Sequence, residues 1–213
     1  MRRTGRLRRK LVKLAFVVAA AGTALGLGAN AAFADTVLNI QYPITTGSTY
    51  LTGPGTTVAL GPGTTTASAD LTTDTLSGIT LSLPPATASF SVLGIPSTAT
   101  TVFNQVGTGT GTINNDTGAV TITAHVNIQI TGLWEAGIPV AVGPACQTVV
   151  PATITVTSGS DWSILAGGTL TGTYTIPLFN NCGLLDVLAP VIDAIVPSSG
   201  NTISLTLGAA SLT

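Results

Sequence analysis

The chain contains no lysine and no arginine after residue 13, although it is 213 residues long. All seven cationic side chains lie before that point, whereas all eight Asp and Glu residues lie between residues 35 and 193. Nucleic acids and anionic lipid surfaces are bound through cations that neutralise phosphate groups. We therefore expect neither nucleic acid nor an anionic membrane surface as a partner of residues 35–213.

Groups that commonly carry catalysis or bind metals are also scarce, because His125 is the single histidine and Cys146 and Cys182 are the two cysteines. A catalytic triad needs a histidine beside a serine and a carboxylate, and the chain has no Gly-x-Ser-x-Gly turn. Zinc sites need more nitrogen and sulfur ligands than these residues supply. We expect no catalytic residue, no metal and no cofactor, and hence no enzyme. A hydrolase with paired carboxylates and a calcium site at Asn114–Asp116 are weaker alternatives.

The cationic residues belong to an export signal. A basic head is followed by a mildly apolar stretch, residues 14–27, and then by Ala32-Phe33-Ala34, a small-x-small cleavage site. The sequence predicts a signal peptide over residues 1–34 and a secreted or cell-envelope protein. The run from Arg8 to Lys13 resembles the twin-arginine pattern, and an ordinary Sec signal is equally compatible with it.

The two cysteines both lie in the exported part. An even number of cysteines in an exported chain is typical of a disulfide. We expect a structural disulfide between Cys146 and Cys182, which by the loop-entropy model is worth about 3 to 4 kcal/mol.

Residues 106–131 carry the clearest structural signal, a strict two-residue alternation on both sides of an Asn/Asp/Gly turn. This pattern predicts an antiparallel hairpin in which Ile113 pairs with Val120. His125 then lies on the solvent face, across from Thr108. The same register places three glycines opposite bulky apolar residues: Gly107, Gly109 and Gly111.

Further alternating runs recur along the chain, separated by turns rich in Gly and Pro. Spacings of about 8 to 12 residues are typical of an antiparallel β-sandwich or a partly open barrel, and we expect one such domain over residues 35–213. Pro43 is expected to end the first strand, residues 37–42, and Pro151 to make residues 149–156 an edge or bulged strand. Residues 184–196 instead follow a helical period, which Pro190 interrupts. The remaining expected strands cover residues 57–60, 76–83, 86–92, 99–106, 169–176 and 203–207.

The C-terminal third contains Thr171–Phe179, then Asn181-Cys182-Gly183, and then Ser199-Gly200-Asn201-Thr202 before a final alternating strand. Together with the arginine-rich signal, these runs resemble small exported β-rich proteins of actinobacteria to which no biochemical function is assigned. The resemblance implies a secreted or envelope location and brings no catalytic residue with it.

Two exposed aromatic positions, Trp134 and Trp162, are candidates for stacking on a ligand because acids, Glu135 and Asp161, lie beside them. Packing in the core or at an edge is the alternative role for both. The sequence favours a non-catalytic structural or binding protein whose partner is a cell-envelope glycan or lipid. Small residues along the strands favour, as an alternative, a carrier of an apolar envelope ligand. An oligomeric outer-envelope pore is a third hypothesis.

Trypsin provides a direct check on the maturation site. Once the first 34 residues are removed, the denatured and reduced protein should be uncut by trypsin, because residues 35–213 contain no Lys or Arg. Mass spectrometry of the digest should find one intact chain beginning near Asp35, while chymotrypsin, as a control, cleaves the same sample. Fully specific tryptic peptides from this region would contradict the expectation.

Overall fold

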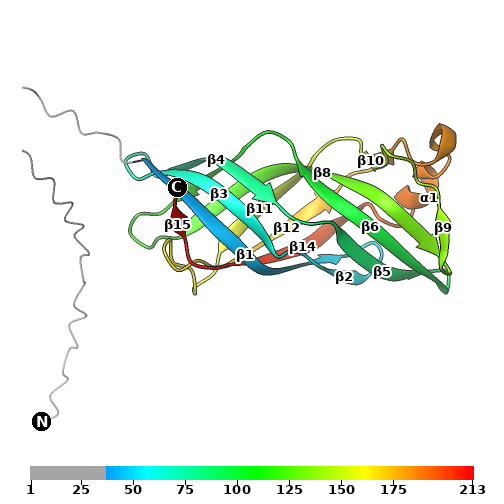
Figure 1. Ribbon diagram of the computed structural model, residues 1–213, viewed down its shortest axis with the longest axis horizontal. Helices are drawn as coiled ribbons and strands as arrows, with labels where there is room; N and C mark the ends of the chain where they lie inside the picture. The colour runs from blue at the N-terminus through cyan, green and yellow to red at the C-terminus, as the bar shows by residue number, and fades with distance from the viewer. Residues whose placement is uncertain (1–36) are drawn as a thin grey trace, which may run out of the picture. The chain divides into compact units, whose positions relative to one another are not determined.

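A computed structural model describes residues 37–213, so the predicted signal peptide at residues 1–34 lies outside the described residues. The described residues form one large antiparallel sheet with a single short α-helix, and the predicted mainly-β antiparallel fold is confirmed (Figure 1). No helix among residues 37–213 is long and apolar enough to cross a membrane.

The elements follow in chain order. The strands are β1 (Val37–Leu51), β2 (Thr56–Ala59), β3 (Gly63–Asp70), β4 (Thr75–Ser82), β5 (Ala86–Val92), β6 (Ile95–Gln105), β7 (Gly109–Ile113), β8 (Val120–Glu135), β9 (Ile138–Val140), β10 (Gln147–Thr148), β11 (Ala152–Ser158), β12 (Gly168–Ile176), β13 (Phe179–Asn180), β14 (Ser198–Leu207) and β15 (Ser211–Leu212). A 3₁₀ turn, η1 (Leu184–Asp186), and helix α1 (Ala189–Asp193) lie between β13 and β14.

The sheet closes on itself. Strand β8 pairs with β7 on one side and with β11 on the other, and the order β8-β11-β12-β14-β1-β3-β4-β7 returns to β8. The sequence predicted an antiparallel sandwich or a partly open barrel, and the observed sheet is antiparallel and closed. Eight strands in a closed circuit leave an interior that side chains just fill. We call this circuit the closed sheet.

Strands β1 and β8 are the longest, and each continues beyond the closed sheet. There β1 pairs with β2, and β8 pairs with β6, β9 and β10. The Thr56 hydroxyl donates a hydrogen bond to the Ser89 carbonyl oxygen at 2.7 Å, which connects β2 to β5. These strands and α1 lie at the end of the unit opposite β15 (Figure 1).

Alternation places apolar side chains inside and hydroxyl groups outside. In β14, which contains the predicted strand at residues 203–207, the side chains of Ile203, Leu205 and Leu207 are buried, while Thr202 is exposed between two inward positions. Successive side chains of a strand point to opposite faces, so this pattern gives the closed sheet an apolar interior and a Thr-rich outer surface.

Two expectations about proline are wrong. Strand β1 does not end at Pro43, which pairs with Thr64 of β3 and lies where β1 changes partner between β15 and β14. The Pro43 nitrogen, which cannot donate a hydrogen bond, therefore lies between the β15 and β14 ladders, where no donor is needed. Strand β11 begins after Pro151 and pairs with strands on both sides, so it is not an edge strand.

The predicted hairpin register is confirmed at its turn. Ile113 pairs with Val120, and Gly111 pairs with Ile122. A Cβ atom at Gly111 would lie 2.4 Å from the Thr121 carbonyl oxygen, so this close backbone approach requires glycine. Gly109 pairs with the bulky Ile79 of β4. Gly107 is different, because it lies between β6 and β7 with φ of 67° and has no strand partner in the register.

The predicted disulfide between Cys146 and Cys182 is confirmed, and both residues are fully buried. Cys146 precedes β10 and Cys182 follows β13, so the disulfide continues the ladder between these two short strands. The predicted helical segment is also confirmed as η1 and α1, with Pro190 in the first turn of α1. Carboxylates attach this segment to β13, since Asp186 accepts from the Cys182 N–H and Asp193 from the Phe179 N–H, both at 2.7 Å.

Removing the disulfide tests its contribution. The double variant Cys146→Ser/Cys182→Ser should lose about 3 to 4 kcal/mol of unfolding free energy, because the unfolded chain regains the freedom of a long loop. Urea titration followed by circular dichroism measures the change. A reductant should lower the urea midpoint of the natural protein and leave that of the variant unchanged. If the natural protein without reductant and the variant had equal urea midpoints, the disulfide would add nothing to the unfolding free energy.

Candidate functional site

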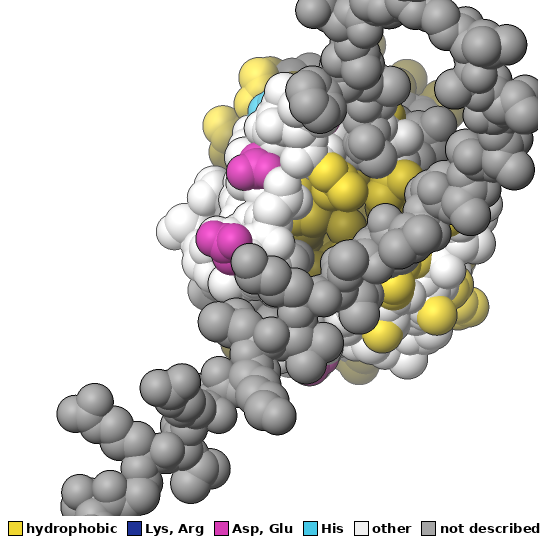
Figure 2. Space-filling view, turned by 90° about the vertical axis from the view of Figure 1, so that its left-hand side faces the viewer, with side chains coloured by type: hydrophobic (Ala, Val, Ile, Leu, Met, Phe, Trp, Pro, Cys, Tyr) yellow, Lys and Arg dark blue, Asp and Glu magenta, His cyan; other side chains and the backbone are white. Residues whose placement is uncertain are grey.

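An apolar cavity of about 80 Å³ lies inside the closed sheet. Every strand of the circuit except β7 contributes to its lining, together with the loop between β11 and β12, residues 159–167. We call this segment the 159–167 loop. Figure 2 shows the corresponding end of the molecule, where hydrophobic side chains line a hollow and acidic side chains lie on the surrounding surface.

Small residues create this space. Ala67 of β3 and Ala124 of β8 line the cavity at inward positions where the other strands carry Ile, Leu or Val. Gly109 lies beside them, and a Cβ atom there would meet the Cβ atoms of Ile79 at 3.2 Å and Ala124 at 3.5 Å. Because the backbone ladder fixes the strand spacing, short side chains at these positions leave volume that the longer neighbours do not fill.

The 159–167 loop covers part of the opening. The Tyr42 hydroxyl donates to the Ile164 carbonyl oxygen at 2.6 Å, and the Trp162 indole N–H donates to the Gly118 carbonyl oxygen at 3.0 Å. The rings of Tyr42 and Trp162 pack with centroids 5.7 Å apart. Asp161 accepts hydrogen bonds from the backbone and the hydroxyl group of Thr169. These contacts hold Trp162 half-buried in the cavity wall.

Polar groups in the lining are already engaged. The Thr65 hydroxyl donates to the Thr80 carbonyl oxygen at 2.8 Å, and both aromatic donors bind backbone carbonyl groups. Within residues 37–213 no buried side-chain nitrogen or oxygen lacks a partner. Burial raises the pKa of Tyr42 to about 12, so its phenol is neutral at physiological pH. The cavity therefore presents hydrocarbon alone.

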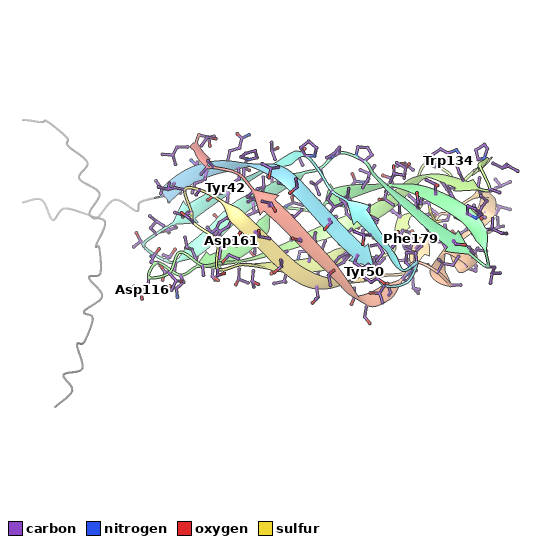
Figure 3. The ribbon with its side chains drawn as sticks, turned by 90° about the horizontal axis from the view of Figure 1, so that it is seen from below. Tyr42, Tyr50, Asp116, Trp134, Asp161 and Phe179 are labelled. Atoms are coloured by element: carbon purple, nitrogen blue, oxygen red, sulfur yellow. A yellow bond between two sulfur atoms is a disulfide. The ribbon has the colours of Figure 1, made fainter. Side chains whose placement is uncertain are left out.

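Acidic turns surround the opening. Asp70 and Asp74 flank the β3–β4 turn, Asp116 lies in the β7–β8 turn and Asp161 in the 159–167 loop, and Figure 3 places Tyr42, Asp116 and Asp161 at the same end. Hydrogen bonds from Thr73 and Thr72 hold the pKa of Asp70 below its usual value. The rim therefore carries negative charge at neutral pH.

A side-chain amide joins two of these turns. Asn115, in the β7–β8 turn, donates from Nδ2 to the Asp74 carboxylate and, at 2.8 Å, to the Leu71 carbonyl oxygen of the β3–β4 turn. The neighbouring Asn114 Oδ1 accepts from the backbone N–H groups of Asp116 and Thr117. The oxygen considered for calcium at Asn114 thus caps the hairpin turn, and no group of three His, Cys, Asp or Glu residues in the described part of the chain could hold a metal ion.

The two candidate stacking residues are not brought together. Trp162 lies in the cavity wall, whereas Trp134, 37% exposed, lies at the far end of β8 (Figure 3). The Trp134 ring covers Gly132, where a Cβ atom would come within 2.5 Å of it. The adjacent Glu135 accepts a hydrogen bond from the Ser97 hydroxyl at 3.0 Å. Trp134 therefore packs along its own strand, away from the cavity.

His125 lies on the exposed face of β8, as predicted, but its expected neighbour is wrong. Its Nδ1 atom is 3.1 Å from the Thr153 hydroxyl of β11 rather than near Thr108. The chain leaves the ladder between β6 and β7, where the Val106 N–H donates to the His125 carbonyl oxygen, and this break displaces Thr108 from the register.

No protein-family model, no curated protein and no solved structure matches this chain. The geometry of the cavity is therefore the basis for assigning its role. Sequence reasoning singled out Trp162 but missed Tyr42 and Ile164, which lie 122 residues apart and meet only because the sheet closes.

Replacing Tyr42 with Phe should loosen the 159–167 loop. The variant lacks the donor to Ile164, a loss worth about 1 kcal/mol, so amide hydrogens of residues 163–167 should exchange faster. Hydrogen exchange read by mass spectrometry measures this, and Tyr50→Phe, at an exposed position on the same strand, is the matched control.

The same variant has a readout in alkaline solution. Because folding raises the pKa of Tyr42 to about 12, the unfolded chain releases this proton at lower pH than the folded protein. Tyr42 therefore makes stability fall as pH rises from about 10 to 12. Tyr42→Phe should show a shallower fall in urea midpoint over that range. An identical fall and unchanged exchange would contradict the assigned contact.

Proposed function

We propose that this chain is a non-catalytic, exported protein that binds an apolar ligand in the cavity of the closed sheet. The observation that carries the proposal is the cavity itself, enclosed by eight strands and lined by hydrocarbon with its few polar groups already bonded. Sites for small molecules are typically concave and mostly apolar. This role joins the binding function expected from the sequence with its alternative, a carrier of an apolar envelope ligand.

The cavity volume limits what enters. An apolar cavity of about 150 Å³ stays dry and binds benzene. At about 80 Å³, the cavity here accommodates a short hydrocarbon segment, the end of an alkyl chain rather than a ring system. The rest of a longer ligand then remains at the opening, beside Trp162.

Absence of turnover is supported by where the reactive groups lie. His125 is on the outer face and contacts Thr153, and the carboxylates of Asp70 and Asp161 accept hydrogen bonds from the Thr72 and Thr169 backbone N–H groups. The cavity lining contains no carboxylate, no histidine and no thiol. Such a surface binds a hydrocarbon but offers no acid, base or nucleophile to a bound molecule.

An exported location is supported by the signal-like first 34 residues and by the disulfide. Disulfides persist in oxidising compartments and are rare in the cytosol. The Cys146–Cys182 disulfide is compatible with the cell envelope or the medium, and both are places where a hydrocarbon ligand needs a carrier through water.

A homologous series of 1-alkanols tests the function. Affinity should rise about fourfold per added methylene, from about 0.8 kcal/mol each, and reach a plateau once the buried segment fills the cavity. Trp162 fluorescence in a Trp134→Phe background reports binding, because Trp162 then is the remaining indole and lines the cavity.

A cavity-filling variant tests whether the alkanol binds inside the cavity. Ala124→Phe places a ring in the cavity and should weaken 1-octanol binding at least about tenfold, whereas Thr121→Phe adds a similar ring on the outer face of the same strand and should leave binding unchanged. Thermal unfolding confirms that both variants fold. Equal affinities for the two folded variants, or no saturable binding of any alkanol, would reject the proposed function.

A further inference from the structure

We infer that the cavity selects ligands whose polar end is uncharged or cationic and rejects those with a carboxylate or phosphate head. The inference rests on the proposed function and deepens it by naming the ligand class. It excludes fatty acids and anionic phospholipids, and it favours neutral single-chain molecules such as long-chain alcohols and their esters, or alkyl amines.

The interior imposes the first part of this selection. A polar head taken into the cavity would find Thr65 bonded to Thr80 and Trp162 bonded to Gly118. A polar group buried without a hydrogen-bond partner loses its hydration, which weakens binding, and an unpaired buried charge weakens binding far more. The head therefore stays at the opening while the alkyl end enters.

The opening imposes the second part. A head group held there lies near the turns that carry Asp116 and Asp161. The β3–β4 turn, with Asp70 and Asp74, is bonded to the first of these turns through Asn115. Residues 37–213 contain no Lys and no Arg, so no cationic side chain is present to pair with a carboxylate or phosphate. His125 does not compensate, because it lies on the outer face against Thr153.

The side-chain amide at the opening is also engaged. The Asn115 amide donates to Asp74 and to Leu71, and the Asp161 carboxylate is itself an acceptor for Thr169. An anionic head therefore meets like charge without a cationic side chain to compensate it. An ammonium head meets opposite charge, and a hydroxyl or ester head is affected little by either.

Three probes with one tail separate these cases: 1-octanol, octanoate and octylammonium, each kept below its micelle concentration. Binding to the purified protein is measured through Trp162 fluorescence in the Trp134→Phe background at low salt. The solution is held at pH 9, where an α-amino group left by cleavage before Asp35 is mostly neutral, while an alkylammonium, like a Lys side chain, stays charged. Octanoate should bind at least about tenfold more weakly than 1-octanol, and octylammonium at least as tightly.

Salt provides a check on the cause. Raising the ionic strength to 1 M shortens the screening length to about 3 Å. The difference in affinity between octanoate and octylammonium should therefore become smaller, while the affinity of 1-octanol changes little. If this difference in affinity were the same at 1 M salt, the charge of the rim would not be its cause.

A charge substitution localises the effect. Asp116→Lys supplies a cation at the rim, and Asp116 enters its turn through the backbone N–H that donates to Asn114, so the turn can form with either side chain. This variant should raise octanoate affinity at least about threefold without changing 1-octanol affinity. Ser91→Lys, which adds the same charge at an exposed position on β5, should change neither.

The outcomes separate the two proposals. If octanoate binds as tightly as 1-octanol to the natural protein, the charge selection is wrong and the apolar site stands. An equal response to Asp116→Lys and Ser91→Lys also overturns the selection at the rim. If none of the three probes binds saturably, the proposed function fails and the inference fails with it.

Discussion

The pairing of β8 with β11 is the contact on which the rest of the structure depends. It joins the two edges of what would otherwise be an open sheet and leaves the circuit without an edge strand. The cavity lies inside this closed circuit, and both β8 and β11 contribute to its lining. This pairing also brings the β11–β12 connection above the opening, where Tyr42 and Trp162 meet.

Local pattern predicted what local forces determine. Alternation predicted the strand at residues 203–207 and the exposed face of His125, and the Asn-rich turn predicted the pairing of Ile113 with Val120. Proline was misread because its effect depends on the neighbouring strand. Pro43 is harmless where β1 changes partners, and that position cannot be recognised before the partners are known.

The candidate site was predictable only in part. Small residues along the strands suggested an interior slot, and Trp162, one of two aromatic candidates for stacking on a ligand, does line the cavity. Tyr42 was not recognised, because its contact with Ile164 spans 122 residues and requires the whole circuit. The lack of Lys and Arg after residue 13, by contrast, can be read directly from the sequence. The structure shows its consequence, because no cationic side chain is available to pair with the acidic rim beside the hydrocarbon interior.

Strand β1 lies between β3 and β14, and its first residues also pair with β15. The beginning of the described chain is thus completed by its last strands, with about 160 residues between the paired positions Ile44 and Leu207. Contacts of such sequence separation form slowly. Until β14 and β15 are available, β1 has one side unpaired, and the circuit cannot close. The order of the strands along the chain therefore leaves one edge of β1 exposed until synthesis is complete, and an unpaired strand edge is a site where chains aggregate.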